Sequence, residues 1–136
     1  MINQFNAEKS CLDKLFAYAD SNSYSVAVSD SEFAPKVDEI FLEESYLVNE
    51  NEQGLSNSSS QMQPSIYQIK INTPKIMGKS KGLEIVDELM TFFARGSNIS
   101  NTTTQQVRIE QVNNIRLPAT STHNVRVVSV NLMVIG

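Results

Sequence analysis

Two stretches of strictly alternating residues constrain the fold of this 136-residue chain more than any other feature. Alternation with a period of two places every second side chain on the same face of a strand. The positions expected to face inward are Tyr67, Ile69 and Ile71 in residues 66–72, and Val128, Val130, Leu132 and Val134 in residues 125–135. The sequence therefore predicts two strands that each bury one apolar face.

Two other segments carry apolar residues at helical spacing. The first covers residues 5–19 and ends at the polar residues 21–23, and the second covers residues 80–95. Ser80 is expected to cap the start of the second helix, and Gly96 fits the left-handed position after its end. The apolar residues of the first helix fall near one stripe, whereas Ile85 and Phe92 widen the apolar set of the second, so the second helix is expected to be covered on more than one side.

Three further strands are expected at residues 24–28, 37–48 and 106–117, and Pro74 is expected to end the strand before it. Val112 breaks the phase set by Val107 and Ile109, which predicts a β-bulge. The element order is helix, strand, strand, strand, helix, strand, strand. Hairpin-length connections favour an antiparallel or mixed sheet of about four to five strands with two helices packed on one face. The predicted fold class is α/β (α+β).

The length fits a single domain over residues 1–136. A content of 40% hydrophobic and 19% charged residues is typical of a folded globular chain. Residues from about 49 to 65 are rich in Ser and Asn and almost free of apolar side chains. Such a segment buries too little area to offset the entropy lost on ordering, so we expect a mobile loop there.

The net charge of −4 is the sum of two unlike halves. Residues 1–60 contain 3 Lys and Arg against 11 Asp and Glu, whereas residues 61–136 contain 8 against 4. Opposite net charges of −8 and +4 suit head-to-tail association between copies, although segregated solvated charges would look the same. The acidic half opposes the approach of phosphates, so direct nucleic-acid binding is not expected.

Residues suited to site chemistry are scarce. A single cysteine and a single histidine form neither an internal disulfide nor a structural zinc site. His123 is expected to be an exposed turn residue, Cys11 a buried or half-buried thiol, and Glu43 and Glu44 point to opposite faces of a strand. No run approaches the roughly 20 apolar residues of a membrane span, and the first residues do not resemble a signal peptide. The composition therefore predicts a protein without enzymatic activity, cofactor, metal or membrane partner.

The sequence Gly78-Lys79-Ser80, between a predicted strand and a predicted helix, resembles the end of a phosphate-binding P-loop. That loop also needs a glycine five positions before the second one, so that its backbone can curl around the phosphates. Thr73 occupies that position and the rigid Pro74 follows it. We therefore interpret the motif as a helix start.

A series of motifs in a fixed order carries a family resemblance. In chain order these are the strand Val37-Asp-Glu-Ile40-Phe-Leu42, the strand Tyr67-Gln68-Ile69-Lys-Ile71, Pro74, Gly78, a helix with Leu83, Val86 and Leu89, the sequence Phe93-Ala-Arg95-Gly96, and the strands Val107-Arg-Ile109 and Val125-Arg-Val127-Val128-Ser-Val130. With this order and spacing, residues 24–136 resemble the tail terminator proteins of long-tailed bacteriophages, including the lambda-type terminator and related phage domains. The chain departs from them in its polar loops and in His123, where the family commonly has an aromatic residue.

The resemblance implies a structural virion protein that is assembled in the host cytoplasm. Such proteins form a homohexameric ring on the head-proximal end of the tail tube, where they end tube polymerisation and present a surface to neck or head-completion proteins. The implied partners are therefore further copies of the chain, the tail tube protein and a neck protein. Another ring component of the neck or head–tail joint is the alternative, and a small nucleotide-binding enzyme is a third possibility.

Opposite charges predict where copies in such a ring would meet. The candidate interface residues are Glu39, Glu43 and Glu44 on one side, and Lys70, Arg108, Arg116 and Arg126 on the other. The candidate residues of a docking loop are Asn51, Gln53, Leu55 and Asn57. For each charged residue, an ordinary solvated side chain is the alternative interpretation.

Overall fold

The computed structural model describes residues 3–28, 38–48, 62–120 and 122–136. The turn expected at residues 29–35 lies outside the described residues, as do Asn51, Gln53, Leu55 and Asn57. These expectations therefore stay predictions.

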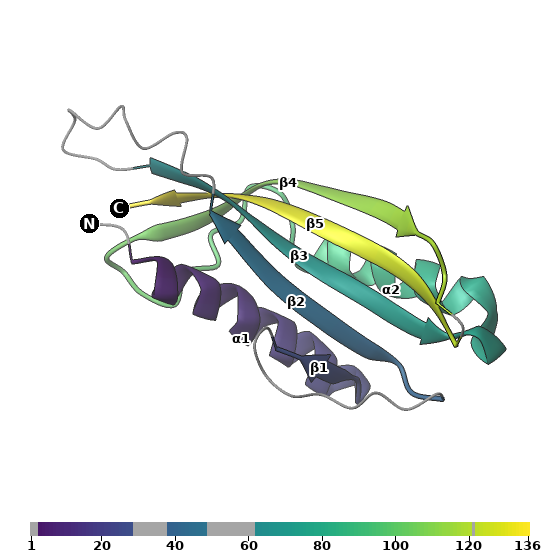
Figure 1. The fold of residues 1–136 in the computed structure, drawn as a ribbon. Helices are drawn as coiled ribbons and strands as arrows, with labels where there is room; N and C mark the ends of the chain where they lie inside the picture. The colour runs from purple at the N-terminus through teal and green to yellow at the C-terminus, as the bar shows by residue number, and fades with distance from the viewer. Residues whose placement is uncertain (1–2, 29–37, 49–61, 121) are drawn as a thin grey trace.

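A five-stranded mixed sheet forms the centre of the fold, with the strand order β1-β2-β3-β5-β4 (Figure 1). Its strands are β1 (Ser25–Ala27), β2 (Phe41–Val48), β3 (Met62–Pro74), β4 (Gln106–Leu117) and β5 (His123–Ile135). β1 pairs in parallel with β2, and all other pairs are antiparallel. The predicted fold class, element order and mixed sheet are confirmed.

Two helices, α1 (Gln4–Asn22) and α2 (Gly78–Phe92), contribute to one core on one face of this sheet. They contact each other there, because the Tyr18 hydroxyl donates a 2.6 Å hydrogen bond to Glu88 and its ring lies 5.8 Å from that of Phe92. The α1 helix ends where expected, at Ser23, which takes a left-handed conformation with φ of 60°. Both described helices therefore lie on the same face of the sheet.

The alternating residues fill the core as predicted. The inward positions of both stretches are buried, together with residues of β2, β4 and the two helices. The largest fully buried side chains are Tyr67, Phe93, Leu15, Leu42, Ile69, Ile71, Ile85, Leu89, Ile109, Leu132, Val86 and Val107. Side-chain periodicity therefore identified the inner face of the two alternating stretches correctly.

Several predicted boundaries are wrong. β3 begins at Met62, inside the segment expected to be a loop, because its first residues pair with the end of β5. β2 begins at Phe41, and the preceding residues 38–40 are not in a strand. The bulge in β4 is confirmed as a register shift between Ile109 and Gln111. Pairing with a distant strand, not local composition, sets where the strands begin.

The second helix is also displaced from its expected position. It starts at Gly78, and Met77 occupies the cap position without a side-chain hydrogen bond, so Ser80 is not the cap. The helix ends before Phe93, whose fully buried ring lies 6.2 Å from that of Tyr67. Phe93 itself departs from helical geometry (φ −94°, ψ 64°). Gly96 does have a positive φ, 87°, but in a turn beyond the helix.

Candidate assembly surface

His123 is buried, with 5% of its surface exposed, so the expected exposed turn residue is wrong. Its ring packs edge-on against Phe41 at a centroid distance of 5.1 Å. Nε2 lies 3.0 Å from the backbone carbonyl oxygen of Glu39, and Nδ1 lies 2.8 Å from the Thr122 hydroxyl. Because His123 opens β5 opposite Pro74, strand pairing draws it into the sheet. It joins the start of β5 to the segment before β2.

Cys11 is fully buried in the core, as expected. Burial raises the pKa of its thiol, and the nearby carboxylates of Glu44 and Glu8 raise that pKa further. A protonated thiol is a weak nucleophile and a weak metal ligand. The described residues contain no group of three or more His, Cys, Asp or Glu side chains placed to hold a metal ion.

The P-loop-like sequence lies where β3 leads through a 3-10 turn (Lys75–Met77) into α2. β3 is flanked by β2 and β5, and both run antiparallel to it. P-loop folds instead place this strand among parallel neighbours connected by helices. Gly78 and Lys79 therefore begin an ordinary core-packing helix. Neither this helix nor α1 is long and apolar enough to span a membrane.

Two of the acidic interface candidates are partnered within the subunit. Glu43 lies 3.8 Å from Nζ of Lys70, which is itself a candidate, and accepts a 3.0 Å hydrogen bond from Nδ2 of Asn72. Glu39 accepts a hydrogen bond from the hydroxyl of Ser25. These three charged side chains have partners on β1, β2 or β3, so they are less available to another copy than the sequence suggested.

Glu44 lies in the interior, with only 4% of its surface exposed. As the alternation predicted, it points to the face opposite that of Glu43, and this is the face that α1 covers. Its carboxylate contributes, after burial itself, to the raised pKa of the Tyr67 hydroxyl. Its inclusion among the surface interface residues is wrong, because the helix layer separates it from solvent.

The basic interface candidates include both partnered and unpartnered side chains. Arg108 is partnered within the subunit, since its guanidinium lies 2.9 Å from Oε1 of Glu110. Arg116 and Arg126 lie directly opposite each other in the β4–β5 register. Neither makes an ion pair or hydrogen bond with any residue in the described ranges. Two like charges in opposing strand positions destabilise a sheet, so this pair is a candidate site for an anionic partner.

The outer edge of β4 has two unlike halves. Segment 96–99 covers the first half through three backbone hydrogen bonds of 2.7 to 2.9 Å that involve Val107 and Ile109. Beyond the bulge, residues 111–117 pair with β5 on one side, and no described strand pairs with the other. Sequence reasoning missed this bare edge, because strand order has no local signal.

The strands from the two charged halves of the sequence lie at opposite edges of the sheet, as far as the described residues go. The acidic half forms α1, β1 and β2, whereas the basic half ends in β4 and β5 at the other edge (Figure 1). Asp20 lies in the last turn of α1, and Asp38 lies three residues before β2. Both are exposed, and neither forms an ion pair within the described ranges. Their position beside the predicted turns was the only signal that could have singled them out.

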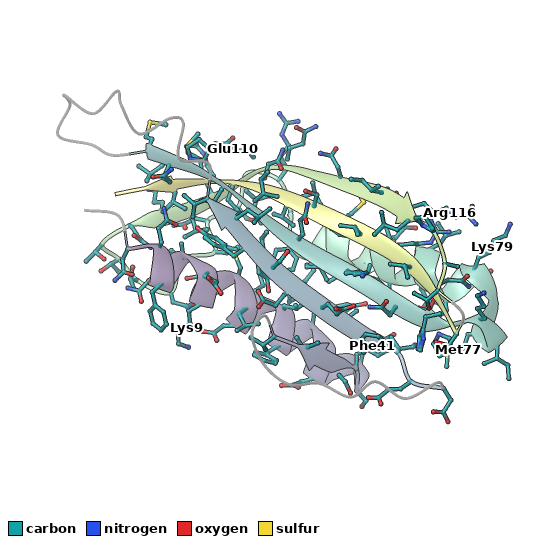
Figure 2. All side chains as sticks on the ribbon, viewed as in Figure 1. Lys9, Phe41, Met77, Lys79, Glu110 and Arg116 are labelled. Atoms are coloured by element: carbon teal, nitrogen blue, oxygen red, sulfur yellow. The ribbon has the colours of Figure 1, made fainter. Side chains whose placement is uncertain are left out.

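Large apolar side chains are exposed at both ends of the molecule. Ile76 is 89% exposed in the turn before α2, and Figure 2 shows Met77, Lys79 and Arg116 at the same end. Phe5 is 73% exposed at the start of α1. The other exposed large apolar residues are Phe16, Leu47, Met62, Leu83, Phe92, Ile115 and Leu117. This distribution is more typical of an assembly component than of a protein with one enclosed site.

The comparisons with known proteins agree with this interpretation. One solved protein structure matches with a TM-score of 0.80 and 14% identity, over 98% of this chain and 96% of its own length, which shows a shared fold. No curated protein matches the sequence. A family model described as phage tail terminator protein matches residues 7–132, nearly the whole chain. The chain therefore belongs to the phage tail terminator proteins, a family of structural components of the virion tail.

Proposed function

We propose that this chain forms a homohexameric ring on the head-proximal end of the tail tube. The ring would end tube polymerisation and join the tail to a neck or head-completion protein after assembly in the host cytoplasm. The observation that carries the proposal is the family match over residues 7–132. The alternative, another ring of the neck or head–tail joint, would use the same fold on a different partner.

Head-to-tail contact between copies is the expected geometry of such a ring. A heterologous contact joins two different surfaces, and it closes when the rotation between copies divides a full turn. The exposed Asp20 and Asp38 lie toward the β1 edge, and the opposed Arg116 and Arg126 lie at the β4 edge. Contact between these two edges would place opposite charges together and disfavour the reversed orientation.

The tube or neck protein is proposed to dock at the end of the sheet where residues 49–61 connect β2 to β3. Two exposed apolar side chains flank that connection, Leu47 at 53% and Met62 at 52% exposure. Deleting residues 51–60 is expected to leave the fold intact and weaken attachment to the tube or neck. Normal tail assembly by this deletion variant would contradict the docking role.

Electron microscopy of the purified chain mixed with tail tubes tests the main proposal. We expect density on one end of each tube, and shorter tubes when the chain is present during polymerisation of the tube protein. Binding to a portal or its adaptor, with tube ends left bare, would favour the alternative neck component. A nucleotide titration tests the third possibility, and heat release on ATP binding would contradict a purely structural role.

Charge reversal tests the ring contact separately. Asp38→Lys and Arg116→Glu are each expected to reduce the light-scattering mass of the assembled ring, more strongly at low salt, because exposed charges are screened over about 8–10 Å at physiological ionic strength. The matched control for Asp38→Lys is Asp87→Lys, which makes the same charge change on the exposed side of α2. A mass that is unchanged in the two edge variants would remove these residues from the proposal.

A further inference from the structure

The bare part of β4 presents a defined set of backbone groups. Before the bulge, Val107 and Ile109 turn their backbone groups outward, toward segment 96–99. The register shift at Glu110 reverses the alternation, because one residue is added to β4 only. After the bulge, the outward-facing N–H and C=O groups therefore belong to Val112, Asn114 and Arg116.

This edge lacks two of the features that usually prevent strands from pairing, proline and lysine, although a bulge precedes it and Arg116 carries a charge. Residues 111–117 contain no proline and no lysine, and the strand is long enough for several hydrogen bonds. Ile115 is 48% exposed and Leu117 is 36% exposed, so the segment also offers apolar contact area. An uncovered edge of this kind is a template for an added strand.

From these observations we propose that the bare edge of β4, residues 112–116, takes a strand from a second copy of this chain, which extends the sheet from one subunit to the next. The inference rests on the proposed ring, and it identifies the hydrogen-bonding groups of the ring contact. Backbone groups of Val112, Asn114 and Arg116 bind the added strand, and side chains fix which strand is accepted.

Charge identifies the second copy as the occupant. Arg116 and Arg126 face each other on the side of the sheet where α2 packs, since a Cβ at Gly82 would lie 3.3 Å from Nε of Arg126. Their mutual repulsion falls when carboxylates approach. The acidic half of another copy, with its net charge of −8 and its exposed Asp20 and Asp38, supplies them. The β1 edge and the β4 edge of the sheet are unlike, so a contact between the β4 edge of one copy and the acidic side of the next can repeat around a ring.

Hydrogen exchange on the wild-type chain tests the proposal directly. In dilute monomer, the amides of Val112, Asn114 and Arg116 are expected to exchange at least tenfold faster than those of Asn113 and Ile115, which face β5. At concentrations and low salt where the chain associates, the three outward amides are expected to become protected. Association that leaves them unprotected would overturn the proposal, and so would a chain that stays monomeric at millimolar concentration.

Proline substitution gives an independent test. Asn114→Pro removes one outward N–H without removing a β4–β5 hydrogen bond, so we expect a folded monomer whose self-association constant falls at least tenfold. Asn114→Ala is the matched control, because it keeps the N–H and loses the same side chain, including its 3.8 Å contact with Sδ of Met90. Equal self-association of the proline and alanine variants would overturn the proposal.

The side of the strand that carries the proline separates a fold defect from an interface defect. Asn113→Pro removes an inward N–H, so it should lower thermal stability, whereas Asn114→Pro should not. Failure of the proposed function has a different signature from failure of this inference. A wild-type chain that self-associates through these amides but leaves tube ends bare would contradict tube capping and keep the strand contact. Capped tubes in which the amides of Val112, Asn114 and Arg116 stay unprotected would support tube capping and contradict the strand contact.

Discussion

The two outer edges of the sheet contrast in how completely they are satisfied within the subunit. At the β1–β2 edge, Glu39 and Glu43 are hydrogen-bonded and Glu44 is buried beneath α1. At the β4 edge, two arginines face each other without a carboxylate partner among the described residues, and half of β4 has no described strand on its outer side. The difference indicates that the first edge is largely satisfied within the subunit, whereas the second has unpartnered groups and is the edge that we propose for contact with another copy.

The largest expected effect comes from reversing the buried charge of the satisfied edge. Glu44→Lys should lower the free energy of unfolding by about 4 kcal/mol or more, because a cation would replace a carboxylate that is hardly accessible to water. Glu43→Lys should cost no more than about 1 kcal/mol, since its ion pair with Lys70 is partly exposed. Chemical denaturation of both variants measures the contrast, and equal losses would contradict the assigned burial.

The next prediction compares the two halves of β4 through one type of substitution. Ile109→Ala in the covered half should cost about 2–5 kcal/mol, because the side chain is fully buried in the core. Ile115→Ala in the bare half should cost under about 1 kcal/mol and instead weaken self-association. Denaturant titration gives the stabilities, and sedimentation gives the association. A large loss of stability for Ile115→Ala would show that its side chain is packed within the subunit.

A smaller effect is expected from the side chain that completes the covered half. Oδ1 of Asn98 accepts hydrogen bonds from the backbone N–H groups of Val107, at 3.0 Å, and of Ser100, at 3.1 Å. Asn98→Ala leaves the N–H of buried Val107 without this partner, so we expect a loss of about 1–3 kcal/mol. Asn98→Asp, which keeps the acceptor, is the control and should retain most of the stability in thermal unfolding.

The smallest effect should have opposite signs for the subunit and for the assembly. Arg116→Gln removes the repulsion from Arg126, so the monomer should gain about 0.2–1 kcal/mol. The same variant should associate more weakly and with less salt dependence, because one of the two attracting charges is gone. Thermal unfolding and sedimentation at two salt concentrations measure both changes. A loss of monomer stability would show that Arg116 makes a favourable contact within the subunit.

Much of the fold could be predicted because side-chain periodicity is a local property. The alternation of residues 66–72 and 125–135 identified the inner face, and the same rule placed Glu43 and Glu44 on opposite faces. The error was to treat Glu44 as a surface residue although it shares a face with Leu42. Periodicity shows which residues share a face, but the packing of α1 decides which face is covered.

The boundaries and the buried histidine required the complete fold. Composition predicted a loop up to residue 65, but Met62 and its neighbours pair with the end of β5, more than 60 residues later in the chain. His123 was expected in a polar turn, and pairing opposite Pro74 buries it instead. In each case, a contact with a distant segment outweighs the local preference.

The sequence alone determined the two-layer α+β architecture, the inner face of the two alternating stretches, and the separation of acidic from basic residues along the chain. These follow from the spacing of side chains along the chain, which needs no knowledge of distant contacts. Only the tertiary structure decided that β4 is an edge strand, that a bulge reverses its outward residues, and that Arg116 faces Arg126. Strand order and register arise from pairing between segments that are not neighbours in sequence, and the candidate assembly surface depends on both.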